Sequence, residues 1–208
     1  MSPVLVLVAA YAVGAIPFSN VAARLTRGVD LREVGSGTVS GTSLFRVAGF
    51  VPLALAGVCD VAKGAVGPLL AGSGRPGLAA LAGGLAVVGH NWSPFLRGAG
   101  GRGISTAMGA LAVTAWPGSL LLLAGLGVGR LIRQTALVSL IAELSLTPLL
   151  ALLGWSGAAL AGLAVTIPMV AKRVVGNAAP RADRRRTYLT RLLFDRDERG
   201  EPNGIVAP

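Results

Sequence analysis

The chain has 208 residues, of which 53% are hydrophobic and only 13% charged, and its mean hydropathy is +0.69. This composition excludes an ordinary soluble domain and indicates an integral membrane protein. The formal net charge of +10 at pH 7 predicts no nucleic-acid partner, because aromatic residues are few and the arginines lie between hydrophobic segments, where membrane topology explains them better.

Uncharged apolar segments determine the predicted fold class. No charged residue occurs over residues 1–23, 104–129 or 144–171, and each run is long enough for the roughly 20 helical residues that cross a bilayer. The sequence therefore predicts an all-α polytopic membrane protein with about seven transmembrane helices, some short or broken. In chain order we expect helices at Val4–Ala23, Val47–Leu70, Leu78–Leu96, Gly103–Ala115, Pro117–Leu131, Thr135–Leu153 and Ser156–Ala171.

A glycine-rich and hydroxyl-rich turn follows the first expected helix and runs from Gly35 to Arg46. Glycines allow successive backbone N–H groups to converge on one oxyanion. Ser36, Thr42 and Arg46 can add hydroxyl and guanidinium donors. The turn thus predicts an anion pocket at a membrane face, and a flexible interfacial loop is the alternative interpretation.

Two further polar clusters are expected toward the same side of the membrane. Asp60 and Lys63 are three residues apart and share one helix face, which favours a site, with a structural ion pair as the alternative. The Gly100-Gly101-Arg102-Gly103 segment opens a helix, so free N–H groups and the Arg102 guanidinium could receive a phosphate. His90 could act as an acid or base, or could be a hydrogen-bonded structural residue.

The other polar residues of the expected spans define no reaction class. Glu143 is a solitary carboxylate in the sixth expected helix, where protonation, pairing with an arginine and a functional role all stay open. The sequence holds no cysteine pair, histidine cluster, P-loop or Gly-x-Ser-x-Gly elbow. It therefore predicts no metal site and gives no support for nucleotide or serine hydrolysis.

Positive charge predicts the orientation in the membrane. With the N-terminus outside, all of the 19 Lys and Arg residues except Arg75 and Lys63 fall in cytoplasmic loops or the tail, as the positive-inside rule requires. We therefore expect a multi-pass protein of the cell inner (cytoplasmic) membrane with a cytoplasmic C-terminus. In the basic tail, the spacing of Leu189, Leu192 and Leu193 predicts a short helix on the inner leaflet.

Four motifs in a fixed order resemble those of one known family. They are Gly14-Ala15-Ile16-Pro17-Phe18-Ser19, the segment from Asp30 to Gly37 that leads into the glycine-rich turn, the D-x-x-K-G segment from Asp60 to Gly64, and Gly89-His90 followed by Pro94-Phe95 and Gly100 to Thr106. On these motifs the chain resembles a divergent member of the bacterial membrane glycerol-3-phosphate acyltransferases that use acyl phosphate, the PlsY type.

The resemblance implies an activity and a division of the chain. Members transfer a fatty acyl group from acyl phosphate to the 1-hydroxyl of glycerol 3-phosphate, giving lysophosphatidate in phospholipid synthesis, without a cofactor. Residues 1–172 would form the membrane-embedded acyltransferase-like domain, in contact with membrane lipid, and residues 173–208 the cytoplasmic tail. Two alternatives stay open: an acyl-phosphate-dependent enzyme with a different acceptor, and a non-catalytic lipid-binding relative.

The resemblance also implies which residues form the site. The expected catalytic residues are Ser36, Arg46 and Arg102, with Arg102 in place of a family lysine. Asp60 and His90 would support the site. The expected substrate-binding residues are Gly35, Gly37, Thr42, Lys63, Gly100, Gly101 and Gly103.

The chain departs from the family pattern at three places. The glycine-rich turn differs at four positions, and Ala99 stands where the family often has the first lysine of K-G-G-K-G. The family also has a histidine and an asparagine in an R-H-R-E-N-like tail segment. Either the region from Arg173 to Asn177 or that from Arg184 to Tyr188 could occupy this place.

Overall fold

Helices account for all of the regular secondary structure in the described residues of the computed structural model, which are 1–35, 37–178 and 184–195. No strand occurs among them, which confirms the predicted all-α class. The α-helices are α1 (Pro3–Gly14), α2 (Phe18–Arg27), α3 (Gly41–Ala48), α4 (Phe50–Ala71), α5 (Pro76–Asn91), α6 (Ile104–Thr114), α7 (Trp116–Leu131), α8 (Thr135–Leu152), α9 (Ala158–Val175) and α10 (Arg184–Phe194), with 3₁₀ turns at Leu31–Glu33 and Pro94–Leu96.

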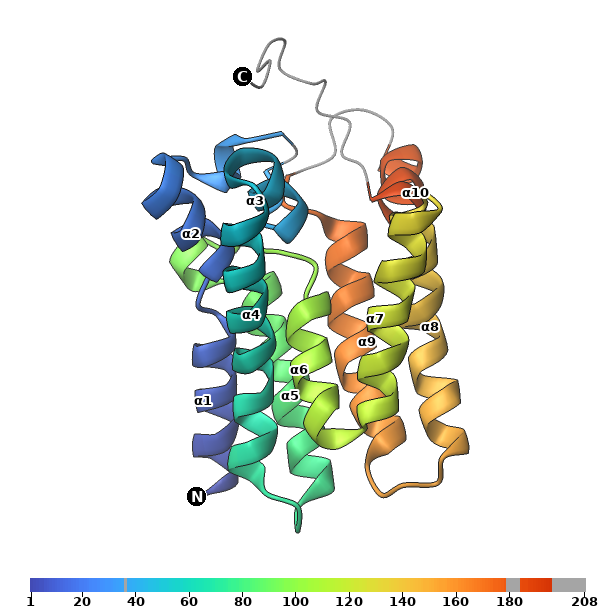
Figure 1. Cartoon of the computed structure of the whole chain (residues 1–208). Coiled ribbons are helices and arrows are strands. Elements are labelled where there is room, and N and C mark those ends of the chain that lie inside the picture. Colours follow the sequence, from blue (N-terminus) through green and yellow to red (C-terminus); the bar gives the residue numbers. More distant parts are fainter. Residues whose placement is uncertain (36, 179–183, 196–208) are drawn as a thin grey trace.

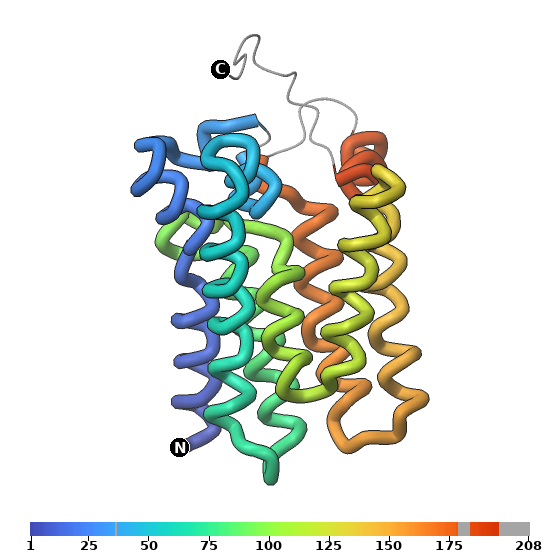
Figure 2. Tube along the Cα trace, in the orientation of Figure 1, coloured from blue at the N-terminus to red at the C-terminus, as the bar shows by residue number. Residues whose placement is uncertain are grey.

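The longer helices lie along a common axis (Figure 1). Helices α1 and α4 to α9 form this bundle, whereas α2, α3 and α10 gather at the end opposite the N-terminus, as the tube in Figure 2 also shows. Four helical segments are long and apolar enough to span a membrane, and α6 and α7 are shorter apolar helices. Large apolar side chains such as Val8, Leu55 and Ile167 are exposed on the outside of the bundle, where lipid would cover them.

The first expected helix, Val4–Ala23, is wrong as a single element. Helix α1 ends at Gly14, and α2 begins at Phe18 after a break at Ile16 and Pro17. Proline disfavours a helical conformation in the residue before it and has no N–H group for the helix ladder. At the break the Ile16 carbonyl group accepts from the Phe18 N–H at 3.2 Å, outside the regular helix ladder, and it can accept a second hydrogen bond from another element.

Three more expected boundaries are corrected by the structure, at positions near glycine or proline. The glycine-rich turn ends before Arg46, because α3 begins at Gly41. The Ser40 hydroxyl caps this helix by accepting from the Ser43 backbone N–H at 3.2 Å. The expected Val47–Leu70 helix is divided at Gly49, whose φ of 83° requires the left-handed region. The expected Leu78–Leu96 helix ends at Asn91, and a separate 3₁₀ turn starts at Pro94.

The C-terminal helix is attached to the bundle through an arginine. The Arg191 guanidinium donates to the carbonyl groups of Val175 at 2.5 Å and Ala178 at 2.7 Å, so it satisfies backbone oxygens at the C-terminal end of α9. Leu189 and Leu193 remain 50% and 39% exposed. The predicted tail helix is thus confirmed, while its position on the leaflet stays a prediction.

Small residues allow the central helices to pack with their backbones in contact. A Cβ atom at Gly64 of α4 would overlap the carbonyl group of Thr106 in α6, and one at Gly109 of α6 would overlap the Val61 carbonyl in α4. In lipid no hydrophobic effect drives helices together, so they associate through close packing of this kind. The glycine content of the apolar segments therefore has a packing explanation.

We expect the Gly64→Ala substitution to destabilise the folded protein. The added methyl group must push α4 from α6, and overpacking of this kind costs about 1–3 kcal/mol. Gly57→Ala is the matched control on the same helix, because nothing lies within 4 Å of the methyl group that it adds. Thermal unfolding in detergent should show a lowered melting temperature for Gly64→Ala only. Equal melting temperatures would mean that α4 and α6 separate without cost.

Candidate functional site

The two glycine-rich segments meet at the end of the bundle that carries α2, α3 and α10. The Val39 backbone N–H donates to the Gly100 carbonyl group at 3.2 Å. The Asn177 side chain joins the same two segments: its amide nitrogen donates to the Gly37 carbonyl at 3.1 Å and the Gly100 carbonyl at 2.9 Å. Its amide oxygen accepts from the Gly100 N–H at 3.1 Å. Segments about sixty residues apart in the chain therefore form one junction.

A cluster of ion pairs fixes the start of the first segment. Asp30 binds the guanidinium groups of Arg24 and Arg32, the latter at 2.6 Å. The hydrogen bonds from Arg32 lower the pKa of the Asp30 carboxyl below its usual value, so the ion pairs persist at neutral pH and are lost only in strong acid. The buried Asn20 oxygen accepts from the Leu31 N–H at 2.8 Å and anchors the turn to α2.

Helix α3 carries the remaining donors of the first segment. The Ser43 hydroxyl donates to the Thr38 carbonyl group at 2.8 Å, which holds the chain entering the helix. Thr42 and Arg46 are exposed, and Arg46 forms no hydrogen bond or ion pair with any described residue. The Arg46 guanidinium is therefore available to a ligand. Ser36, an expected catalytic residue, lies outside the described residues.

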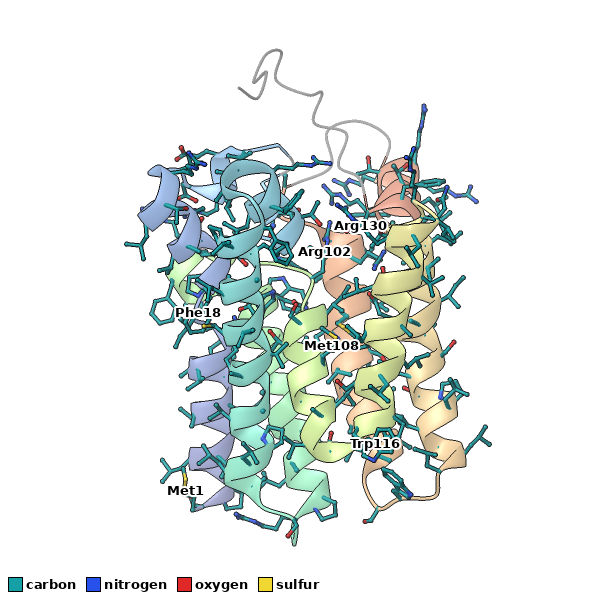
Figure 3. All side chains as sticks on the ribbon, in the orientation of Figure 1. Met1, Phe18, Arg102, Met108, Trp116 and Arg130 are labelled. Atoms are coloured by element: carbon teal, nitrogen blue, oxygen red, sulfur yellow. The ribbon has the colours of Figure 1, made fainter. Side chains whose placement is uncertain are left out.

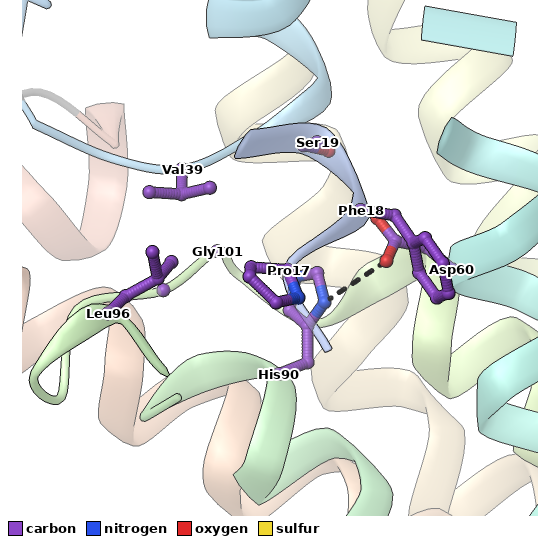
Figure 4. A pocket seen from close by; sticks show the side chains of 9 residues that line it. Pro17, Phe18, Ser19, Val39, Asp60, His90, Leu96 and Gly101 are labelled. Carbon is purple, nitrogen blue, oxygen red and sulfur yellow. Dashed lines mark ion pairs between the residues drawn. The ribbon is translucent and has the colours of Figure 1, made fainter. Parts of the chain in front are cut away.

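A small pocket lies beneath the junction (Figure 4). Its empty volume is about 190 Å³, opening included. Within it Asp60 and His90 face one another, with His90 Nδ1 3.7 Å from the Asp60 carboxylate. Gly101 has no room for a side chain, because a Cβ atom there would overlap His90 Nε2. The lining residues are Pro17, Phe18, Ser19, Val39, Asp60, His90, Leu96, Gly100 and Gly101.

Lys63 occupies the break between α1 and α2 rather than the pocket lining. Its ammonium group lies 2.7 Å from the Asp60 carboxylate and donates to the Ile16 carbonyl at 2.6 Å. It also lies 5.6 Å from the centre of the Phe18 ring. Lys63 thus adds a second donor to the Ile16 carbonyl group at the break, beside the Phe18 N–H. The expected shared face of Asp60 and Lys63 is confirmed, and these contacts match the structural alternative.

Arg102 is buried beside the junction and is held by two neighbours. Its Nε lies 2.6 Å from the Asp195 carboxylate, and its Nη1 donates to the Lys172 carbonyl at 2.8 Å. Figure 3 places Arg102 at the same end of the bundle as Arg130, far from Met1. Gly103, with φ of 81°, precedes the first residue of α6, so the expected helix start is confirmed.

The pocket brings together only some of the expected site residues. Asp60, His90, Gly100 and Gly101 line it, and Gly37 contacts it through the Asn177 bridge. The other described members do not line it: Gly35, Thr42, Arg46, Lys63, Arg102 and Gly103. No cluster of three or more metal-ligating side chains occurs in the described ranges.

Three residues at this end of the bundle were missed from the sequence as site members. Asn177 ends the region from Arg173 to Asn177, which is one of two possible counterparts of the family's tail motif. That motif is the signal in the sequence that points to Asn177. Lys172 and Asp195 carried none, because both sit among many charged residues at the end of the membrane portion. Only their contacts with Arg102 distinguish them.

Glu143 is paired with an arginine, which selects one of its three open interpretations. Arg173 Nη2 lies 2.8 Å from the carboxylate and 3.1 Å from the Ser139 hydroxyl, and Nη1 donates to the Ala136 carbonyl at 2.9 Å. Both side chains are almost completely buried between α8 and α9. Helix α9 also extends past the expected end at Ala171 to Val175, so Arg173 belongs to it.

The fold and the site define a multi-pass membrane protein with a small pocket at one end of its helix bundle, in which Asp60 and His90 lie among glycines and apolar side chains. The sequence model of the family described as glycerol-3-phosphate acyltransferase matches residues 4–178. The chain therefore belongs to the glycerol-3-phosphate acyltransferase family, which confirms the resemblance of its motifs.

Individual relatives agree with this assignment. The glycerol-3-phosphate acyltransferase of Synechococcus sp. (strain CC9902) is 35% identical over 82% of this chain and 86% of that protein. Glycerol-3-phosphate acyltransferase 2 of Moorella thermoacetica is 45% identical over a shorter match. That match spans 43% of this chain and 46% of that protein, which is less than half of either. The crystal structure of PlsY, an integral membrane glycerol 3-phosphate acyltransferase, in its glycerol 3-phosphate form has a TM-score of 0.77 at 28% identity over 96% of both chains.

Proposed function

We propose that this chain transfers a fatty acyl group from acyl phosphate to the 1-hydroxyl of glycerol 3-phosphate. The products are lysophosphatidate, for phospholipid synthesis, and inorganic phosphate. Family membership over residues 4–178 is the observation that carries the proposal. The related PlsY structure is of a glycerol 3-phosphate form, which agrees with this acceptor.

The reaction requires alignment and charge neutralisation more than a strong base. The acceptor oxygen forms an ester bond to the acyl carbon, the bond from that carbon to the phosphate oxygen breaks, and the hydroxyl proton passes to the departing phosphate. An acyl phosphate is already activated, so binding both phosphate groups in a fixed arrangement supplies much of the acceleration. The glycine junction offers backbone N–H groups for this purpose.

Arginines flank the junction and supply the charge that the reaction needs. In this proposal Arg46, exposed and without a described partner, and the buried Arg102 bind phosphate oxygens, with Ser36 as a third catalytic residue. Asp60 and His90 support the pocket floor from α4 and α5. The substrate phosphates are bound by the expected glycine and threonine positions of both segments.

The proposed orientation places this site in the cytoplasm. The end of the bundle with α2, α3 and α10 carries most of the arginines, and the N-terminus lies at the opposite end. Positive residues favour the cytoplasmic side, so the proposal has the N-terminus outside, the C-terminus inside, and the inner membrane as the location. Residues 1–172 then form the acyltransferase unit and residues 173–208 the tail.

Reconstitution tests the proposed function directly. Purified protein in phospholipid vesicles receives palmitoyl phosphate and glycerol 3-phosphate, and mass spectrometry identifies the product while phosphate release is measured. Vesicles without protein are the blank. Lysophosphatidate is the expected product. Acylation of a different polyol phosphate or alcohol would favour the different-acceptor alternative, and phosphate release no faster than the blank with every acceptor would favour a non-catalytic lipid-binding protein.

A further inference from the structure

Lys172 carries a buried positive charge near the end of α9. The residue is only 1% exposed. Its ammonium group makes one long hydrogen bond, to the Gly98 carbonyl at 3.4 Å, and lies 5.2 Å from the centre of the Trp92 ring. No carboxylate of the described ranges forms an ion pair with it. Burying an ammonium group without a counter-charge is costly, so a buried cation in this state is expected to have an anionic partner.

Arg102 adds a second buried cation at the same place. It contacts the Lys172 backbone through Nη1, and its Nε pairs with Asp195, whose side chain is 31% exposed. Its Nη2 makes no hydrogen bond within the part of the chain that the structure describes. Of the two cations only Arg102 has a carboxylate partner among the described residues, and that carboxylate is partly exposed, which leaves net positive charge and open donors in a buried position.

The two cations lie against the glycine segment that also lines the pocket. Lys172 Nζ reaches the carbonyl group of Gly98, and Gly100 and Gly101 of the same segment form part of the pocket wall. The Trp92 ring faces the same ammonium group and favours a cation at this position beside the turn.

We infer that Lys172 is a substrate-binding residue that holds a phosphate group together with Arg102. The inference rests on the proposed function, because acyl phosphate and glycerol 3-phosphate both carry the phosphate chemistry that this pair recognises. Lysine binds phosphate as a point charge, and arginine adds directed hydrogen bonds. Together they give the site a two-cation phosphate clamp with contributions from α9 and from the start of α6.

Kinetics of Lys172→Gln test the role of the charge. We expect the KM for one phosphate substrate to rise about tenfold to hundredfold, as loss of a charge-assisted hydrogen bond predicts, with a parallel rise in the inhibition constant of inorganic phosphate. Varying glycerol 3-phosphate and acyl phosphate in turn shows which substrate Lys172 binds. Arg27→Gln, which removes an exposed charge at the same end of the bundle, is the control and should leave both KM values unchanged.

Labelling of the wild-type protein gives a measurement that does not depend on how a variant folds. Pyridoxal 5′-phosphate forms an imine with a lysine amine with loss of water, and borohydride reduces it to a stable adduct. The chain has only two lysines, Lys63 and Lys172, so peptide mass spectrometry separates them. We expect labelling at Lys172 that glycerol 3-phosphate or acyl phosphate prevents.

The outcomes separate this inference from the proposed function. Unchanged KM values in a folded Lys172→Gln variant would overturn the inference, and so would labelling of Lys172 that neither substrate prevents. Phosphate-protected labelling in a wild-type protein that transfers no acyl group would keep the inference and reject the proposed function. A lower kcat with unchanged KM values would make Lys172 a structural residue and would also overturn it.

Discussion

Replacing Arg46 by alanine is expected to reduce acyl transfer by about 100-fold or more without unfolding the protein. Loss of one preorganised donor to a developing or transferred anionic group costs about 10²–10³ in rate. Arg46 is exposed on α3 and binds no described residue, so its removal should change the free energy of unfolding by less than about 0.5 kcal/mol. Steady-state rates in vesicles and thermal unfolding in detergent measure the two effects.

Two further variants make the Arg46 experiment decisive. Arg46→Lys keeps the charge but loses the planar pair of donors, so we expect partial activity between wild type and alanine. Arg27→Ala removes an exposed arginine at the C-terminal end of α2 and should retain full activity. Normal acyl transfer by Arg46→Ala would remove this residue from the catalytic set and leave Arg102 as the only described arginine in it.

Replacing Glu143 by alanine is expected to give the largest loss of stability. The change leaves the Arg173 guanidinium buried between α8 and α9 without its carboxylate. Removing one partner of a buried pair costs about 3–5 kcal/mol, because the remaining charge is uncompensated. Thermal unfolding and the yield of monodisperse protein in detergent should both decrease. Glu143→Gln, which keeps a hydrogen-bond acceptor, should lose less.

A double variant distinguishes the cost of an unpaired buried charge from the cost of lost packing. Glu143→Leu combined with Arg173→Met removes both charges and fills similar volume, so we expect it to recover much of the stability that either single substitution loses. If the double variant is as unstable as the sum of the two singles, the pair contributes through packing alone. The charge explanation for the Glu143→Ala effect would then be wrong.

The fold was largely predictable because bilayer length and missing charge mark each apolar helix. The sequence predicted a break in the charge-free run beside Trp116 and Pro117, and the structure has it one residue earlier, at Ala115, because Trp116 and Pro117 open α7. The break at Pro17 was visible in the sequence but was hidden inside a longer apolar run that suggested one span. Helix α3 was missed because Gly41 is a poor helix residue, and only the Ser40 cap shows that a helix begins there.

The site was predictable in its residue types but not in its contacts. Hydroxyl groups, glycines and arginines signalled an anion site, and the segments that carry them do meet. No local pattern could show that Asp195 pairs with Arg102, since the two are separated by five helices and many other charged residues. Likewise, Lys172 is distinguished by having no acidic partner among the described residues, and this depends on tertiary packing.

The amide bridge of Asn177 has a consequence for how the protein is made. The hydrogen bond to Gly37 joins positions 140 residues apart in sequence, and the bridge follows directly after α9. During synthesis from the N-terminus, the Val39 and Gly100 contact can form early, but the bridge must wait until α9 has entered the bilayer. A nascent or truncated chain without that helix would lack the amide bridge between its two turns, so phosphate affinity should emerge only when membrane insertion is complete.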